Sequence, residues 1–485
     1  MKERVMASVS ALSLLYSLFV LTIFILPTGI KEGVRDPVYF THPFVGSFTM
    51  LLDPLNAPIA FSIALVTALV AVYSIRYMKH RMDEMKEEEG DHQPWGVYYM
   101  LYNMFSAAML GTVLSTNLIE FYVFLELTLI PSFLLIAFYG YGNRMRIAIM
   151  YLLWTHIGAL VFFLGVLVFG LTTGVFDILN VETNRFYMGL GQSLAENVRW
   201  VVALVILIGL FVKMAVFGVH IWLPYAHAEA PTPVSALLSP NLIGIAGYAM
   251  IRITYTLFPQ FLQDISIYLL GLALLTMIYG GLMALAQDDF KRFLAYSSVS
   301  QMGYLLLGIS TLNSYGITGA MLHYTSHAVG KAVLFMVAGV LIVQLHGLRS
   351  IRGMGGLAAK MPLTTSLALI GFMHITGVPP SLGLWSEILI LIGAVGKASE
   401  ASTLSFIVIL LLLVVAIGLS TAYAFVTAKR IFFGAITEKL REEAKEAGWI
   451  LVGTILVIAV VGVLLFVYPT VFIDSLVNMI SSIYG

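Results

Sequence analysis

The chain has 485 residues, of which 60% are hydrophobic and 11% are charged, and its mean hydropathy is +0.94. Soluble domains carry about 25% charged residues, so this composition excludes an ordinary soluble enzyme and indicates a membrane-embedded protein. The net charge of +0 predicts no nucleic-acid partner. A sequence without cysteine excludes disulfides and cysteine-ligated iron–sulfur clusters within this chain.

Apolar runs long enough to cross a bilayer recur along the whole chain. The first follows two basic residues and lacks a small-residue cleavage site, which favours a retained span over a signal peptide. We expect thirteen spans, near 6–26, 55–75, 96–115, 118–139, 147–171, 200–223, 233–257, 265–287, 293–311, 316–345, 362–396, 402–428 and 449–471. Residues 362–396 count as one crossing that is interrupted in the middle.

The placement of lysine and arginine tests this count. Of the 26 basic residues, three fall inside expected spans, and 18 of the other 23 lie in loops on the N-terminal side of the membrane. The three are Lys213, Arg252 and Lys331, and the five on the opposite side are Lys31, Arg35, Arg185, Arg199 and Lys397. By the positive-inside rule, the N-terminus is cytoplasmic and the C-terminus is outside. Two crossings at 362–396 would move the last basic loop to the wrong side.

The segments between the spans predict no extramembrane domain. Residues 79–93 and 436–447 are charged and compatible with helix, and we interpret them as solvated cytoplasmic connectors, with docking to a partner subunit as the alternative. Residues 172–199 form a long polar loop on the outside. Chemistry must therefore occur within the membrane or in another chain.

Several ionisable residues fall inside the expected spans, where they are costly unless they are paired or hydrated. Glu126 lies in the middle of the fourth span, and Lys213 and His220 lie in the sixth. Glu387 follows the helix breaker TGVPPSLG in the eleventh span. A buried lysine near a carboxylate is a proton-affinity switch, because a change in their separation or hydration changes how tightly the lysine holds its proton.

The tenth span carries a polar stripe. His323, His327 and Lys331 are spaced i, i+4, i+8, which keeps them on one side of an α-helix. The two histidines have the i, i+4 spacing of a pair of metal ligands. HYTSH, however, lacks the glutamate of the zinc-binding motif H-E-x-x-H, and no third ligand is evident, so we expect no metal. No cofactor motif is present either, and a proton relay through histidine and water is the favoured interpretation.

Other polar residues in the spans have a plainer interpretation. Lone histidines such as His156 and His374 are interpreted first as hydrogen-bonded packing residues. Glu120 and Arg252 lie near span ends, where snorkelling to the interface accounts for them.

Three stretches resemble the antiporter-like subunits shared by respiratory complex I, membrane-bound hydrogenase-type complexes and multisubunit Mrp cation/proton antiporters. They are KMAVFGVHIWLPYAHAEAPTPVSALL (213–238), QDDFKRFLAYSSVSQMGYLLLG (287–308) and YVFLELTLIP (122–131). The resemblance covers roughly residues 95 to 435. It implies an all-α polytopic membrane protein with about 13–14 transmembrane helices, built from two inverted five-helix repeats that each contain a broken helix. Spans six and eleven would be the broken ones.

The resemblance also implies roles for the ionisable residues. Glu126 and Lys213 would form the charge pair of the first half-channel, His323, His327 and Lys331 the central or second-half relay, and Glu387 the terminal position. With His220, these residues are the expected proton-translocating set. The glutamate at 387, and a chain that ends soon after the last span, favour the M type of these subunits. The expected divisions are 1–95, 96–260, 261–435 and 436–485.

One position departs from the family pattern. In the M type, the helix after the proline-rich loop carries a bridging lysine, and SPNLIGIAGYAMIRI (239–253) aligns Gly244 with it. No ionisable residue lies between Ala230 and Ile251. The path would then need Lys331, the histidine stripe or water to bridge the two halves.

Three functions are compatible with these features. The leading hypothesis is a proton-translocating plasma-membrane subunit of a redox-driven complex, whose partners are a redox module, further antiporter-like subunits and the lipid bilayer. The chain would hold no redox centre of its own. The alternatives are a sodium/proton antiporter subunit of the Mrp kind and a structural subunit that has lost pumping.

Overall fold

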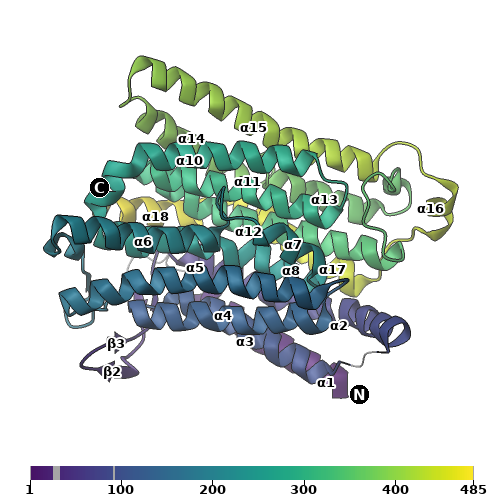
Figure 1. Cartoon of the computed structure of the whole chain (residues 1–485). Helices are drawn as coiled ribbons and strands as arrows, with labels where there is room; N and C mark the ends of the chain where they lie inside the picture. Colours follow the sequence, from purple (N-terminus) through teal and green to yellow (C-terminus); the bar gives the residue numbers. More distant parts are fainter. Residues whose placement is uncertain (1, 26–32, 91–92, 484–485) are drawn as a thin grey trace.

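The computed structural model describes residues 2–25, 33–90 and 93–483. Helices run side by side along one direction, and the two ends of the chain lie at opposite ends of the bundle (Figure 1). Two residues used in the predictions, Leu26 at the end of the first expected span and Lys31 in the outer charge count, lie outside the described residues.

The helices of the first half are α1 (Lys2–Ile25), α2 (Ala57–Glu84), α3 (Trp95–Leu114), α4 (Leu118–Tyr139), α5 (Arg144–Thr173), α6 (Glu196–Met214), α7 (Trp222–Glu229), α8 (Thr232–Leu237) and α9 (Ile243–Ala249). Those of the second half are α10 (Pro259–Leu285), α11 (Phe290–Ser310), α12 (Ser314–Gln344), α13 (Pro362–His374), α14 (Leu382–Ala398), α15 (Thr403–Phe432), α16 (Glu438–Glu443), α17 (Trp449–Val467) and α18 (Thr470–Ile483). Single π-helical turns are η1 (Met85–Glu89), η3 (Leu238–Leu242) and η4 (Met250–Tyr255), and 3-10 turns are η2 (Leu190–Ser193) and η5 (Leu357–Ala359).

All thirteen expected spans correspond to helices. Within the described ranges, eleven stretches are long and apolar enough to cross a membrane, and each coincides with an expected span. The other two expected spans are α11 and the interrupted pair α13–α14. The all-helical, multi-span fold class is therefore confirmed, whereas the inverted repeat that would relate the two halves stays a prediction.

The centre of the bundle is shielded from lipid. In the most apolar 18-residue stretch of each helix, 94% of the residues are buried in α12 and 89% in α2. The value is 100% in α8–η3–α9–η4 (Thr232–Tyr255), which we call the π-interrupted helix. It is only 22% in α1 and α15, and both helices lie at the edges of the bundle (Figure 1). Polar side chains on the central helices are thus surrounded by protein, where hydrogen bonds and water can compensate them.

Short strands, which the sequence pattern did not predict, lie outside the helices. The pairs are β1 (Val34–Arg35) with β4 (Leu51–Leu52), β2 (Phe40–His42) with β3 (Gly46–Phe48), and β5 (Leu179–Asn180) with β6 (Arg185–Phe186), all antiparallel. The β2–β3 hairpin is in register with Phe40 opposite Phe48 and protrudes from the bundle (Figure 1). Of the expected helical connector at 79–93, α2 and η1 cover the residues up to Glu89, and residues 91 and 92 lie outside the described part of the chain. The connector at 436–447 contains only the short α16.

Candidate functional site

The sixth span breaks immediately after Lys213. Helix α6 ends at Met214, Ala215 adopts a left-handed backbone with φ +57°, and α7 resumes at Trp222. The indole Nε1 of Trp222 donates to the carbonyl of Val212 at 3.0 Å, and the same carbonyl accepts from the Ala215 amide at 3.3 Å. Lys213 therefore lies in the last turn of α6, where the helix dipole favours a positive charge.

Lys213 and Glu126, the expected charge pair, are not in salt-bridge contact. Lys213 is 3% exposed, and its Nζ has no hydrogen-bond partner among the described residues. The Glu126 carboxylate instead contacts His156 Nδ1 of α5 at 2.9 Å. The side chains of Glu126 and His156 are 20% and 44% exposed, so this contact reaches the outer surface of the bundle. The sequence identified Glu126 but interpreted His156 as a packing residue.

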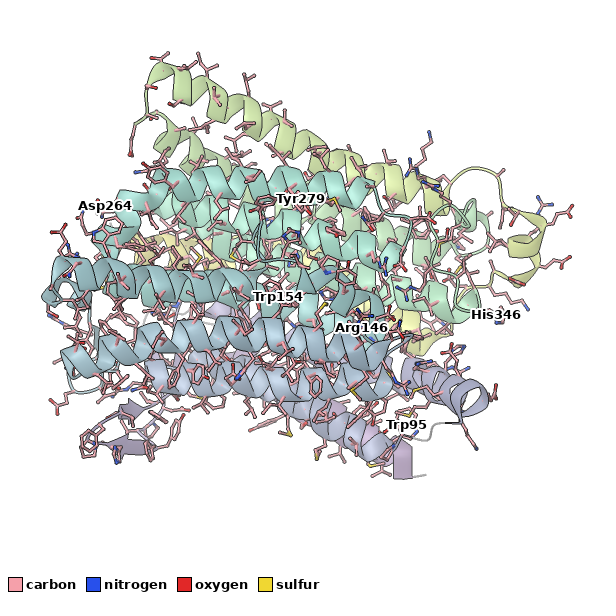
Figure 2. All side chains as sticks on the ribbon, in the orientation of Figure 1. Trp95, Arg146, Trp154, Asp264, Tyr279 and His346 are labelled. Carbon is pink, nitrogen blue, oxygen red and sulfur yellow. The ribbon has the colours of Figure 1, made fainter. Side chains whose placement is uncertain are left out.

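His220 lies within the break of the sixth span. Its Nε2 is 3.2 Å from the hydroxyl of Tyr279 on α10, and its ring stacks on Phe217. Figure 2 labels Tyr279 midway along the bundle, between Asp264 at one end and His346 at the other. The irregular segment therefore contributes a histidine to the middle of the structure.

The stripe on α12 is fully buried. Lys331 Nζ donates to the Leu294 carbonyl at 2.9 Å and to the hydroxyl of Ser297, both on α11. His323 Nδ1 is 3.3 Å from Ser386 Oγ on α14, and neither ring nitrogen of His327 has a partner in the described structure. The stripe thus connects α11, beside the first half, to the second broken helix.

The eleventh span breaks between His374 and Leu382, as expected. The carboxylate of Glu387 packs against the backbone at Gly377, whose φ is +63°, and a Cβ there would lie 2.5 Å from Glu387 Oε2. His374 Nδ1 is 3.2 Å from Ser326 Oγ, which donates to the carbonyl of His374 at 2.9 Å. The glycine permits the carboxylate to approach the broken backbone closely.

Two buried groups beside the stripe, His227 and Lys291, are among those that the sequence interpretation missed. His227 of α7 is 0% exposed, stacks on Phe335 of α12 one turn beyond Lys331, and has no partner for either ring nitrogen among the described residues. Lys291, counted as a loop charge, is also 0% exposed and donates to the carbonyls of Ala228 and Ala230. The motif that contains His227 was noticed, but its helix is too short for a periodicity signal.

The snorkelling interpretation of Arg252 and Glu120 is wrong. Arg252 is 2% exposed and forms an ion pair with Asp53 at 2.5 Å. Glu120 is 1% exposed and accepts hydrogen bonds from the Tyr39 hydroxyl and from the Thr116 amide. Snorkelling failed as an explanation because Asp53 and Tyr39 belong to the distant N-terminal segment, which span-by-span inspection does not connect to these helices.

Gly244, at the position expected for a bridging lysine, has no space for a side chain. A Cβ there would lie 2.4 Å from Cδ2 of the Tyr324 ring on α12. Tyr324 is held in place because its hydroxyl donates to the carbonyl of Asn241 at 2.7 Å. The tyrosine occupies the gap between the π-interrupted helix and the stripe. Among the residues with described positions, no group of three or more His, Asp or Glu gathers as a metal site.

Broken helices and buried ionisable side chains in a lipid-embedded bundle define a membrane protein of the transporter class. The sequence profile of the family described as NADH:quinone oxidoreductase/Mrp antiporter, TM, matches residues 115–420, and that of the NADH-ubiquinone oxidoreductase (complex I) chain 5 N-terminus matches residues 40–86. The chain belongs to this NADH:quinone oxidoreductase/Mrp antiporter family, as the three motifs predicted.

Relatives and solved structures agree with this assignment. The F(420)H(2) dehydrogenase subunit M of Methanosarcina mazei is 32% identical over 90% of this chain and 84% of its own. The NADH-quinone oxidoreductase subunit M of Rickettsia bellii is 32% identical over 70% of this chain, which spans 66% of that relative, just under two thirds. A chain of respiratory complex I from Thermus thermophilus with bound NADH superposes with a TM-score of 0.81 and 26% identity, over 100% of this chain and 96% of that one. The chain is thus a multi-pass protein of a bacterial or archaeal plasma membrane.

Proposed function

We propose that the chain is a proton-translocating, antiporter-like subunit of a redox-driven respiratory complex. The observation that carries the proposal is a set of buried ionisable groups that extends through both broken helices and α12. Polar atoms of Lys213, His227, His327, His374 and Glu387 are buried without a hydrogen-bond partner among the described residues. Because unpaired buried polar groups are costly, water or a mobile proton is needed to compensate them.

Protons would enter the first half at Lys213. The open separation of Lys213 from Glu126 corresponds to one state of the switch, in which His156 holds the carboxylate. Closing that separation would favour the protonated lysine, and opening it would release the proton toward His227 and Lys331. Because the Glu126–His156 contact reaches the bundle surface, a neighbouring membrane subunit could control it.

The remaining parts of the proposal rest on the family. Electron transfer would occur in a redox module of other subunits, and further antiporter-like subunits and lipid would surround this one. The N-terminus would face the cytoplasm. Residues 96–260 and 261–435 would form the two half-channels.

Sodium transport is less well supported by the contacts near Lys331. The three hydroxyl residues that could offer oxygen ligands each donate to a backbone carbonyl: Tyr324 to Asn241, Thr325 to Pro58 and Ser326 to His374. These hydroxyls are therefore engaged in helix packing. Replacing sodium by potassium in a vesicle assay should leave transport unchanged, and dependence on sodium would favour the Mrp-like alternative.

The decisive experiment measures proton pumping by the assembled complex in vesicles. Lys213→Ala and Glu126→Ala should each lower pumping at least tenfold, because either change removes one half of the switch. Lys360→Ala is the matched control, since this lysine is exposed in a loop and should pump normally. Normal pumping by both test variants in fully assembled complexes would favour a structural subunit.

A further inference from the structure

The ion pair between Asp53 and Arg252 lies outside the set of residues described above. Arg252 Nη2 contacts Asp53 Oδ2 at 2.5 Å and Oδ1 at 2.7 Å, and the two side chains are 3% and 4% exposed. Asp53 Oδ1 also accepts hydrogen bonds from the backbone amides of Leu55 and Asn56 at the start of α2. A buried ion pair is weak evidence for stability, because desolvation offsets much of its attraction. Its position therefore matters more than its strength.

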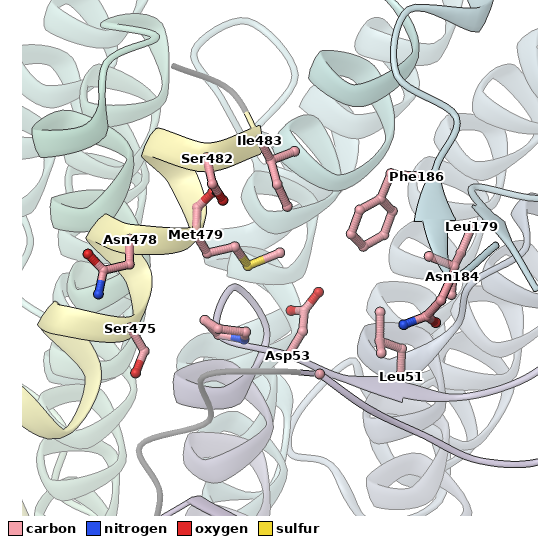
Figure 3. A pocket seen from close by; sticks show the side chains of 12 residues that line it. Leu51, Asp53, Leu179, Asn184, Phe186, Ser475, Asn478, Met479, Ser482 and Ile483 are labelled. Atoms are coloured by element: carbon pink, nitrogen blue, oxygen red, sulfur yellow. The ribbon is translucent and has the colours of Figure 1, made fainter.

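The pair faces a cavity at the end of the molecule where the C-terminus lies. The cavity has a volume of about 480 Å³ and is lined by Asp53, Asn184, Phe186, Ser475, Asn478 and Met479, among others. Figure 3 shows the Asp53 carboxylate pointing into the space between Phe186 and the Met479 side chain of α18. The guanidinium carbon of Arg252 lies 4.6 Å from the centre of the Phe186 ring. Both partners of the ion pair therefore adjoin the cavity wall.

Toward the middle of the bundle, polar groups recur at intervals along the π-interrupted helix. Arg252 Nε donates to the hydroxyl of Tyr248 at 3.0 Å, and that hydroxyl donates to the Val113 carbonyl at 2.9 Å. Further along, the buried amide of Asn241 has no partner for its side-chain oxygen or nitrogen in the described structure. Irregular π-helical turns such as η3 and η4, which flank this stretch, occur frequently at functional sites.

The inner end of this row reaches Lys331. The hydroxyls of Ser239 on η3 and Ser298 on α11 are 2.7 Å apart. The next residue back along α11, Ser297, is the hydroxyl that accepts from Lys331 Nζ. Buried serine, amide and tyrosine groups of this kind can be bridged by water, which conducts protons.

We infer that the Asp53–Arg252 pair is the gate of a proton outlet that begins at Lys331, follows the π-interrupted helix and opens at this cavity. The inference rests on the proposed function. A proton released by Lys331 would cross the row and bind an Asp53 oxygen, which neutralises that carboxylate. Arg252, which keeps its charge, would move against Phe186. The proton then passes to water in the cavity, and the ion pair re-forms.

This outlet gives Gly244 a place in the mechanism. A side chain at 244 would displace the ring of Tyr324, whose hydroxyl donates to the Asn241 carbonyl within the row. Tyr324, packed against Gly244, provides a neutral hydroxyl. The arginine at the outer end has a different effect, because a positive charge at a pore mouth opposes the return of cations.

A thiol-blocking experiment tests the outlet, since the chain contains no native cysteine. Met479→Cys places a thiol beside Asp53, and a charged, membrane-impermeant thiol reagent is added to vesicles from the side of the C-terminus. Labelling of the cysteine and a loss of proton pumping of at least fivefold are expected. Ser481→Cys is the matched control, because this exposed residue of the same helix does not line the cavity and should pump normally when labelled. The wild-type complex treated with reagent corrects for cysteines in other subunits.

Two results would overturn the outlet: absence of labelling at residue 479, or full pumping after labelling. Asp53→Asn gives a second measurement, because it keeps the shape but removes the titratable group, and it should lower pumping at least fivefold in complexes that still assemble. Lys213→Ala in the same assay separates the two proposals. If that variant and Glu126→Ala both pump normally, the proposed function fails, whereas loss in either variant with normal pumping by labelled Met479→Cys rejects only the outlet.

Discussion

At the scale of single residues, close packing explains the departure at Gly244 better than a change of function does. The ring of Tyr324 occupies the space in which a side chain at 244 would lie. The sequence alone showed a missing lysine, and only the position of Tyr324, eighty residues away in the chain, shows why no lysine fits. The lysine is therefore absent at 244 because the Tyr324 ring leaves no space for it.

Gly244→Ala should therefore destabilise the protein by about 1–3 kcal/mol, because the added methyl group overlaps the Tyr324 ring. Thermal unfolding of the purified complex in detergent measures the change. Gly271→Ala is the control within another membrane-spanning helix. Nothing lies within 4 Å of a Cβ at Gly271, so alanine should leave stability equal or raise it by up to about 1 kcal/mol. Equal unfolding temperatures for the two variants would contradict the steric explanation.

Asp177, in the loop after α5, gives a prediction on pH. Its Oδ1 accepts hydrogen bonds from the Ser47 amide and from Asn117 Nδ2, yet burial raises the pKa of this carboxyl above its usual range. A raised pKa means that the ionised form is disfavoured in the folded state, so folding loses stability as pH rises through the folded pKa. Asp177→Asn should raise the unfolding temperature at pH 7, and the gain should vanish as pH falls toward about 4, near the unfolded pKa. A gain that is the same at both pH values would reject this explanation.

At the scale of elements, the break in the sixth span is stabilised by contacts of the two helices that flank it. Lys213 keeps its place because α6 packs closely on α5, where a Cβ at Gly209 would lie 2.5 Å from the Phe162 amide nitrogen. Small residues permit such close approach between membrane helices. The indole of Trp222 then gives the Val212 carbonyl a second hydrogen bond beside the one from the Ala215 amide.

Trp222→Phe removes that hydrogen bond and should cost about 0.5–1.5 kcal/mol, the net contribution of one hydrogen bond, because the Val212 carbonyl still accepts from the Ala215 amide. Thermal unfolding measures the loss, and pumping should fall with it because Lys213 lies one residue beyond Val212. Trp449→Phe is the control, since this tryptophan is 73% exposed and donates no interhelical bond in the described structure. A Trp222→Phe variant as stable as Trp449→Phe would show that the break does not need this contact.

At the scale of the whole molecule, the arrangement places lipid-facing helices at the rim and charged groups at the centre. The exposed apolar side chains of α15, such as Leu411 and Val414, are 62% and 69% exposed and suit contact with lipid or a neighbouring subunit. The count of basic loop residues, from which the orientation was predicted, included residues that are not exposed in loops. Lys291 and Arg81 were counted as loop charges, but both are buried and bind backbone carbonyls.

The predicted orientation can be measured with single cysteines. Lys86→Cys and Ser402→Cys place exposed thiols in η1, which continues α2, and in the segment just before α15, at opposite ends of the bundle (Figure 1). An impermeant thiol reagent added to intact cells should label residue 402 and leave residue 86 unlabelled, because the basic loops are expected in the cytoplasm. The reverse pattern would invert the orientation.

The sequence by itself placed the helical spans, the break in the eleventh span and the ionisable residues inside the spans, whereas the break in the sixth span was implied by the family resemblance. Hydropathy and proline–glycine breakers are local signals, and a charge in an apolar run is visible without knowledge of its neighbours. The three family motifs likewise carried the assignment, because they are long and continuous in the chain.

Only the tertiary structure decided which groups meet. Glu126 contacts His156 rather than Lys213, Arg252 contacts Asp53, and Tyr324 fills the space beside Gly244. Such partners lie between 30 and 199 residues apart in the chain. Helical periodicity specifies which face a residue occupies but not which helix lies opposite, so long-range pairing depends on how the helices pack.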